Sequence, residues 1–145
     1  MLKLLIDKYH RINQNKERLE KKLNVKIENR GKEIYINGNS EEEFVAEKVI
    51  EALNFGFPFS TALLIKDEEL ELFKINIKSH TKRKDLARIR GRIIGMNGKT
   101  LRALTELTKC FFELKNNEVG IIGNPEYLKN AESAIISLIK GTRQA

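Results

Sequence analysis

Two glycines placed three positions apart, Gly95 and Gly98, form the stretch of this sequence best suited to chemistry. Glycine lacks a Cβ atom, so a turn with glycine at both ends lets the backbone lie close to a ligand. A helix is expected to start directly after this turn, and its first amide groups and dipole favour an anion. Arg92, Lys99 and Arg102 add positive charge around the same point. The combination indicates a seat for a phosphate group, although the same glycine spacing also occurs in ordinary turns.

Positive charge is concentrated in the C-terminal half of the chain. The 145 residues include 27 Lys and Arg against 20 Asp and Glu. Residues 1–70 carry a net charge of −1, and residues 71–145 carry +8. Between residues 82 and 102 there are eight cations and a single anion, Asp85. Such a cluster favours a polyanion as the partner, and a solvated basic surface is the alternative.

Other chemistries that these residue types suggest lack essential members. Gly98, Lys99 and Thr100 resemble the end of a P-loop, but that motif requires glycine at position 93, which is isoleucine. The Gly-x-Gly of a dinucleotide-binding fingerprint is absent, and the basic half offers only scattered carboxylates for a metal-dependent nuclease. One cysteine and two histidines cannot form a zinc site. We therefore expect no enzyme, no metal and no cofactor.

The composition is typical of a soluble globular protein, with 32% charged and 41% hydrophobic residues. The longest apolar run, residues 55–65, contains Gly, Pro, Ser and Thr and is too short to span a bilayer. No secretory signal pattern starts the chain. The single cysteine, Cys110, lies in an apolar run, which is typical of a small core residue, and fits a reducing cytosol. A cytoplasmic protein without membrane contact is expected.

A repeat organises most of the chain. When the sequence is shifted by 85 residues against itself, 12 of the 38 pairs from Leu19/Leu104 to Gly56/Gly141 are identical. Composition alone would give about three. We therefore expect a first unit at residues 1–57, a linker or helix at residues 58–70, and a second unit at residues 71–145.

Hydrophobic periodicity predicts the elements of the second unit. Residues 72–78 alternate as a strand does, and the apolar positions from 85 to 94 follow helical spacing. A second helix follows the glycine turn, two strands flank a turn at residues 116–117, and Asn124 and Pro125 begin a last helix that Gly141 ends. The apolar residues expected to pack in the helices are Leu86, Ile89, Ile93, Ile94, Leu101, Leu104, Leu107, Leu128, Ala131, Ile135, Leu138 and Ile139. On the first of the two strands, Cys110, Phe112 and Leu114 are expected to share one face.

The 85-residue register carries this order to the first unit. It predicts a helix ending near Leu23, strands at residues 25–28 and 33–36, and a helix over residues 41–54 that a Ser40–Glu43 capping box begins. Residues 1–9 are left open between a helix and a remnant strand. At the turn, His10 and Asn13 take the places of the two glycines. This copy is therefore expected to serve packing or protein contact, with RNA contact by Arg11, Asn13 and Lys16 as the alternative.

The order strand, helix, helix, strand, strand, helix, with Gly-x-x-Gly between the first two helices, resembles a eukaryotic-type KH domain. The resemblance implies an α+β fold of two tandem type I KH domains. Each has a three-stranded sheet packed by helices, and the N-terminal domain is degenerate.

Two such units, with the second carrying Gly-Arg-Ile-Ile-Gly-x-x-Gly-Lys-Thr at residues 91–100, resemble the archaeal relatives of the Dim, Pno and Krr family of small-subunit ribosome assembly factors. Residues 56–64 and 84–86 are also similar to that family. The resemblance implies binding of single-stranded RNA near the 3′ end of small-subunit ribosomal RNA. It also implies contact with a Nob-type endonuclease and with the alpha subunit of an archaeal initiation factor.

The resemblance assigns RNA backbone to the glycine turn and bases to a groove walled by Ile93, Ile94, Leu101 and Phe111 or Phe112, although each of these is individually better explained as core. Since Met96 and Asn97 are uncharged, the neighbouring cations should supply most of the attraction. A protein–protein scaffold and a general RNA-binding adaptor are the alternatives. The predicted RNA-binding residues are Lys82, Arg83, Lys84, Arg88, Arg90, Gly91, Arg92, Ile93, Ile94, Gly95, Met96, Asn97, Gly98, Lys99, Thr100 and Arg102.

Overall fold

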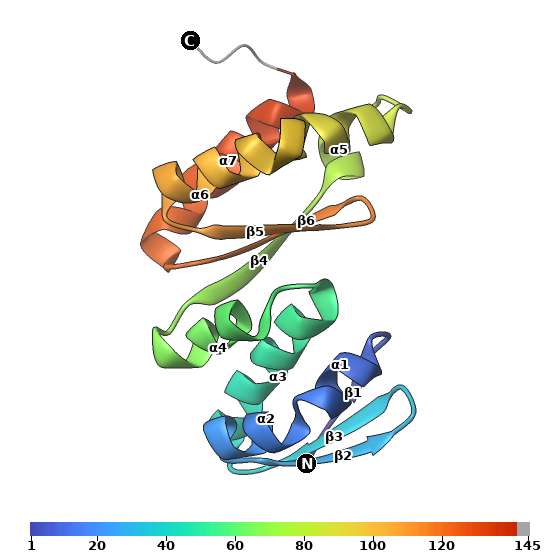
Figure 1. The fold of residues 1–145 in the computed structure, drawn as a ribbon, viewed down its shortest axis with the longest axis vertical. Helices are drawn as coiled ribbons and strands as arrows, with labels where there is room; N and C mark the ends of the chain where they lie inside the picture. Colours follow the sequence, from blue (N-terminus) through green and yellow to red (C-terminus); the bar gives the residue numbers. More distant parts are fainter. Residues whose placement is uncertain (142–145) are drawn as a thin grey trace. The chain divides into compact units, whose positions relative to one another are not determined.

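The structure, a computed structural model, describes residues 1–141, and they form two compact units. Unit 1 covers residues 1–69 and unit 2 starts at residue 70. In each unit, helices cover one face of a three-stranded antiparallel sheet (Figure 1). Unit 1 contains β1 (Leu2–Leu5), α1 (Tyr9–Gln14), α2 (Lys16–Leu23), β2 (Lys26–Arg30), β3 (Glu33–Asn37), α3 (Ser40–Phe55) and α4 (Phe59–Asp67). Unit 2 contains β4 (Glu71–Asn76), the 3-10 helix η1 (Ile77–His80), α5 (Leu86–Ile94), the 3-10 turn η2 (Met96–Gly98), α6 (Lys99–Thr108), β5 (Phe111–Lys115), β6 (Glu118–Gly123) and α7 (Pro125–Lys140).

Unit 2 has the order of elements that its periodicity predicts. The sheet order is β4-β6-β5, so the last strand pairs with both others. The core joins the sheet to α5, α6 and α7 through buried aliphatic side chains such as Ile93, Ile121 and Ile135, each fully buried. Cys110 and Phe112 are buried in the same core, as their shared strand face predicts. The Asn124 side chain accepts a hydrogen bond from the Glu126 amide at 3.0 Å and begins α7.

Two apolar residues predicted to pack in the helices of unit 2 are instead exposed. Leu107 is 81% exposed and Ile94 is 37% exposed. A spacing of three residues falls 60° short of a full helical turn, so Leu107 is rotated by about 120° from Leu101 around α6. Leu104, between them, faces the core.

Unit 1 repeats the same topology with a shorter first strand and shorter first two helices. The open question over residues 1–9 is resolved by β1, which pairs antiparallel with β3 and places the sheet in the order β1-β3-β2. Ile27, Ile34 and Ile36 point into the core beneath the helices. Residues 58–70, expected to be a linker or helix, contain α4, which packs against α3 within unit 1.

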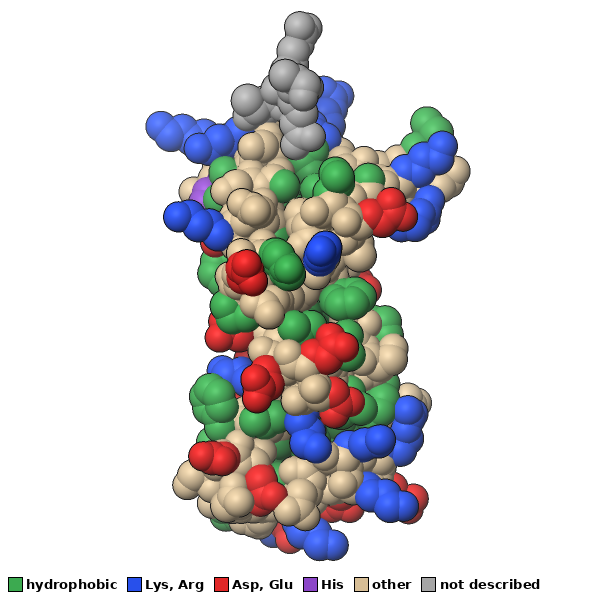
Figure 2. Space-filling view, turned by 90° about the vertical axis from the view of Figure 1, so that its left-hand side faces the viewer, with side chains coloured by type: hydrophobic (Ala, Val, Ile, Leu, Met, Phe, Trp, Pro, Cys, Tyr) green, Lys and Arg blue, Asp and Glu red, His purple; other side chains and the backbone are tan. Residues whose placement is uncertain are grey.

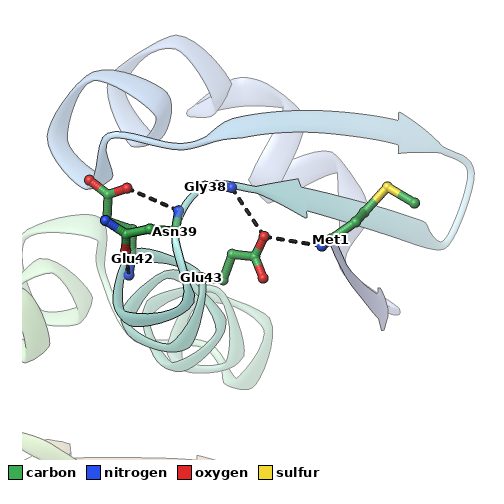
Figure 3. A network of polar contacts seen from close by, with 5 residues as sticks. All are labelled: Met1, Gly38, Asn39, Glu42 and Glu43. Atoms are coloured by element: carbon green, nitrogen blue, oxygen red, sulfur yellow. Dashed lines mark hydrogen bonds and ion pairs between the residues drawn. The ribbon is translucent and has the colours of Figure 1, made fainter.

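The start of α3 differs from the predicted capping box. Asn39, one residue before Ser40, is the N-cap: its side chain accepts from the Glu42 amide at 2.8 Å, and the Glu42 carboxylate accepts from the Asn39 amide at 3.2 Å (Figure 3). Glu43, predicted to close the box, accepts instead from the Gly38 amide at 3.1 Å. The observed cap gives hydrogen-bond acceptors to the backbone amides of Gly38, Asn39 and Glu42, whereas the predicted box would serve only those of Ser40 and Glu43.

Candidate nucleic-acid interface

The loop between α5 and α6 needs glycine at both ends for different reasons. Gly95 has φ +75° and Gly98 has φ +75°, a region that residues with a Cβ rarely adopt. A Cβ on Gly95 would lie 2.7 Å from the backbone nitrogen of Thr100, so this glycine also allows α5 and α6 to approach. A Cβ on Gly98 would meet only the end of the Arg102 side chain, at 3.3 Å. Gly98 is therefore required by its backbone angle alone.

The loop presents the N-terminus of α6 without a cap. No side chain accepts a hydrogen bond from its first amides, and its first turn holds no acidic residue. The Lys99 amide donates to the Met96 carbonyl, so an anion would meet the amides that follow it and the positive end of the helix dipole. Lys99 and Arg102 are exposed on the same first turn, and the exposed Met96 and Asn97 form the tip of the loop. Asn97 has φ 55°, which asparagine tolerates better than most residues.

Two of the predicted RNA-binding arginines have partners within the protein. Arg92 donates from Nη1 to the carbonyl oxygen of Leu138 at 2.9 Å, near the C-terminal end of α7. Arg90 donates to the side-chain oxygen of Asn117 in the β5–β6 turn. Both arginines are half-buried. They tie α5 to its surroundings and are less available to a ligand than Lys99.

Unit 1 contains a counterpart of Arg92 that the sequence repeat did not reveal. Arg11 in α1 donates to the carbonyl oxygens of Leu53 and Phe57 at the end of α3. Leu53 and Leu138 are partners in the 85-residue register, so both arginines bind the same point of the fold. The unit without a glycine loop keeps this arginine, which indicates a structural function.

Unit 1 lacks four residues in the region that corresponds to the glycine loop of unit 2. Arg11 and Arg92 lie 81 positions apart, whereas Leu19 and Leu104 lie 85 apart. Unit 2 therefore has four additional residues between these points, the length of the Gly-x-x-Gly turn. The predicted pairing of the glycines with His10 and Asn13 is wrong, since both lie inside α1 and the helix break falls at Asn15.

The predicted basic cluster extends over both ends of α5. Lys82, Arg83 and Lys84 are exposed in the segment before α5, whereas the glycine loop follows α5. The nine residues of α5 separate the two by about 14 Å along its axis. Arg88 is exposed on α5, and its Nε lies 3.9 Å from the Asp85 carboxylate.

The predicted base groove is only partly accessible. Ile93 is fully buried and Phe112 is 8% exposed, so both are core residues. Leu101 and Phe111 are half-buried, and Ile94 is exposed. Among the predicted loop residues, Gly91 is exposed and Thr100 packs beneath Gly95.

The one cysteine is buried, and the described residues contain no metal-binding cluster. Burial raises the pKa of the Cys110 thiol, even though its sulfur contacts the Thr108 carbonyl at 3.5 Å. A buried thiol with a raised pKa is a poor nucleophile. Within residues 1–141, no group of three or more His, Cys, Asp and Glu side chains could hold a metal ion, and no helix is long and apolar enough to cross a bilayer.

Known proteins are similar to this chain in sequence and in fold. A KH domain-containing protein of Methanocaldococcus jannaschii is 28% identical over 137 residues, which are 90% of this chain and 60% of the relative. RNA-binding protein PNO1 of Oryzias latipes is 34% identical over 100 residues, 67% of this chain and 41% of the relative. The chain thus spans less than two thirds of the length of these curated relatives.

Two solved structures from Pyrococcus horikoshii cover nearly all of the chain. The crystal structure of its Dim2p has a TM-score of 0.88 at 27% identity, covering 99% of this chain and 92% of that one. The same protein in a complex with a/eIF2alpha and rRNA has a TM-score of 0.87 at 27% identity, covering 99% and 86%. Residues 70–145 match the family model for the second KH domain of PNO1. The chain therefore belongs to the eukaryotic-type KH-domain family (KH domain type I), with PNO1 and Dim2 proteins as its relatives.

Proposed function

We propose that this protein binds single-stranded RNA through unit 2 and acts as a non-catalytic factor in assembly of the small ribosomal subunit. The uncapped N-terminus of α6, presented by Gly95 and Gly98, is the observation that carries the proposal. Relatives named for pre-rRNA processing and a related structure solved with rRNA support it.

In the proposed mechanism, the loop and the first turn of α6 hold the sugar-phosphate backbone of about four nucleotides, as KH domains do. The first amides of α6 donate to a phosphate, and Lys99 and Arg102 neutralise its charge. Exposed Ile94 and Met96 offer apolar contact to bases. The chain has no Trp, so aromatic stacking is not the main device.

The rRNA and a/eIF2alpha of a related structure support part of the proposed partners, and the family resemblance alone implies the 3′ end and the endonuclease. The RNA is small-subunit ribosomal RNA near its 3′ end, and the protein partners are the alpha subunit of an archaeal initiation factor and a Nob-type endonuclease. The proposed compartment is the cytoplasm. Crosslinking the protein to RNA in its own cells and sequencing the attached RNA tests the assignment. Recovery of mostly mRNA would leave a general RNA-binding adaptor in its place.

A substitution of Gly98 tests the loop directly. Gly98→Asp places a carboxylate at the proposed phosphate seat, and its Cβ meets no backbone atom there. Aspartate is strained at φ +75° but tolerates this region better than most residues, so the fold should persist. We expect the affinity for single-stranded RNA to fall at least tenfold, or about 1.4 kcal/mol. Gel-shift or anisotropy titrations measure it, and circular dichroism checks the fold.

Gly31→Asp is the matched control. Gly31 also has a positive φ, +63°, and open space around its Cβ position, but it lies in the β2–β3 turn of unit 1. The control adds the same charge and similar backbone strain and should leave RNA affinity unchanged. If folded Gly98→Asp protein bound RNA as tightly as the unaltered chain, the loop would not be the RNA site, and a protein–protein scaffold would be the better description.

A further inference from the structure

A second basic site lies in unit 2, at the end of α5 remote from the glycine loop. Here η1, the segment that follows it and the last turn of α7 surround an open hollow of about 480 Å³. Four of its six lining residues carry basic side chains, and the other two carry hydroxyl groups. We call it the η1 hollow, and its lining residues are Lys78, Ser79, His80, Thr81, Lys82 and Lys140.

Among residues 1–141, no acidic side chain pairs with the lysines of the η1 hollow. No carboxylate lines it, and within residues 1–141 no ion pair involves Lys78, Lys82 or Lys140. The nearest acid in sequence, Asp85, lies beside Arg88 at 3.9 Å. Figure 2 shows Lys and Arg side chains (blue) gathered near the histidine (purple) visible in that view. Lysines converging without a counter-ion repel one another, so an anion that enters the hollow is attracted by all of them.

The backbone around the η1 hollow is held in place by the fold. Ile77, at the start of η1, is fully buried, and its amide donates to the Asn117 carbonyl at 2.8 Å. The Asn76 side chain accepts from the Lys78 amide at 3.0 Å, and the Thr81 hydroxyl accepts from the Arg83 amide at 3.1 Å. In addition, η1 packs against α7, which carries Lys140. The lysines therefore extend from fixed backbone positions on three segments.

Unit 1 shows that the fold does not need this segment. Ile6 occupies the position of Ile77: both are buried, and the Ile6 amide donates to the Lys32 carbonyl, as the Ile77 amide does to Asn117. Arg11 follows Ile6 by five positions, whereas Arg92 follows Ile77 by fifteen. Unit 2 thus carries ten additional residues here, and they include most of the η1 hollow.

The hollow found in unit 1 differs in charge. It measures about 510 Å³ and is lined by Glu17 and Glu20 as well as Lys21 and Lys26, so it has no preference for anions. Unit 2 alone combines an additional glycine loop at one end of α5 with an additional basic segment at the other.

We propose that the η1 hollow binds a phosphate group of the RNA strand outside the nucleotides held by the glycine loop. The inference rests on the proposed function, because it assigns a second contact to the same strand. Lysine ammonium groups bind phosphate as point charges, and the Ser79 and Thr81 hydroxyls can donate to its oxygens. A strand whose four nucleotides occupy the glycine loop needs further nucleotides to reach the hollow, because the loop follows α5 and most of the lining residues precede it.

RNA length distinguishes the two sites. We expect Lys78→Gln/Lys82→Gln/Lys140→Gln protein to bind a four-nucleotide RNA as the unaltered chain does, but to bind a twelve-nucleotide RNA about tenfold more weakly or worse. Its salt dependence with the longer RNA should also fall by about 0.7 in logarithmic slope, the amount that one lost phosphate contact removes. The charge-matched control replaces three exposed lysines outside the hollow, Lys22, Lys66 and Lys129, with Gln.

If the two triple variants bind the longer RNA with equal affinity, the η1 hollow does not bind RNA, however much both affinities have fallen. The same result is expected if an acidic protein segment, and not RNA, occupies the hollow. Gly98→Asp separates the two proposals: if it binds both RNAs as tightly as the unaltered chain, the proposed function itself fails. As an independent measurement, the His80 imidazole NMR signal should shift with the twelve-nucleotide RNA and stay in place with the four-nucleotide RNA. His10→Gln assigns the signal.

Discussion

Arg92 and Arg102 carry the same charge near the same loop, but they serve different functions. Arg92 is half-buried and donates to the Leu138 carbonyl, while Arg102 is exposed on the first turn of α6. Arg11 in unit 1 makes the equivalent contact to Leu53 without any glycine loop nearby. Stability should therefore depend on Arg92, and RNA affinity on Arg102.

This difference predicts opposite results for two substitutions. Arg92→Gln should lower the free energy of unfolding by about 1–2 kcal/mol, because the Leu138 carbonyl loses a charged donor. Arg102→Gln should leave stability unchanged and reduce the logarithmic salt dependence of RNA binding by about 0.7. Urea unfolding and a salt series of RNA titrations measure the two effects.

Arg11→Gln is the control for the structural effect. It should destabilise the protein as Arg92→Gln does and leave the salt dependence of RNA binding unchanged. A reduced salt dependence for Arg92→Gln, without loss of stability, would instead mean that Arg92 contacts a phosphate.

The sequence predicts Gly95 and Gly98 as a loop because glycine spacing is a local signal. It could not predict the function of Arg92 in the same way. The hydrogen-bond partner of Arg92 lies 46 residues away, on the last helix, and a basic residue in a basic stretch has no pattern of its own. Arg-Ile at residues 11–12 recurs at 92–93, but also at 88–89, so the sequence alone does not identify Arg92 as the counterpart of Arg11.

At the scale of single elements, the start of α3 shows how neighbouring carboxylates divide their contacts. Glu42 closes the capping box with Asn39, while Glu43 accepts from the Gly38 amide and lies 3.3 Å from the N-terminal ammonium group of Met1 (Figure 3). The Gly38 hydrogen bond, supported by the ammonium group, holds the pKa of Glu43 below its usual value of 4.5.

This pKa predicts a stability change in acid. Because the pKa of Glu43 is lower in the folded state, its contribution is present above about pH 4.5 and is lost as pH falls through the folded-state pKa. The Glu43→Gln variant lacks this titration. The thermal midpoint of the unaltered protein should therefore fall more steeply below pH 4.5 than that of Glu43→Gln. Parallel slopes for the two proteins would show that Glu43 does not contribute.

Sequence patterns predicted most helices and strands but not the frame of this cap. Asn39-x-x-Glu42 and Ser40-x-x-Glu43 satisfy the same rule. In the structure, the reciprocal hydrogen bonds of Asn39 with Glu42 and the contact of Glu43 with Gly38 distinguish them. The 85-residue repeat favours Asn39 as the N-cap, since it pairs Asn39 with Asn124, and both are N-caps in the structure. Leu107 was misplaced for another reason: three-residue spacing alone does not tell which side of α6 meets the sheet.

At the scale of the whole molecule, the two units share a core topology and differ by two additions around α5. The repeat is visible from Leu19/Leu104 onwards because the later strands and last helices keep one register. Before Leu19 and Leu104 the two units no longer align in this register, because unit 2 has ten additional residues ahead of Arg92 and four after it. Identity is lost in the region that carries the proposed RNA contacts, so the sequence could predict the common fold but misaligned the turn.

The proposed division of function assigns RNA to unit 2 alone, and paired charge removals in the full chain test this. Lys99→Gln/Arg102→Gln should weaken binding of single-stranded RNA about tenfold or more at physiological salt, because both cations lie at the phosphate seat. Lys16→Gln/Lys22→Gln removes equal charge from α2 of unit 1 and should weaken binding less than about twofold through the long-range field alone. RNA titrations at two salt concentrations compare the pairs. Equal losses would mean that unit 1 also holds the strand, as Arg11, Asn13 and Lys16 first suggested. A larger loss for the unit 2 pair alone would fit a first unit that serves packing or protein contact.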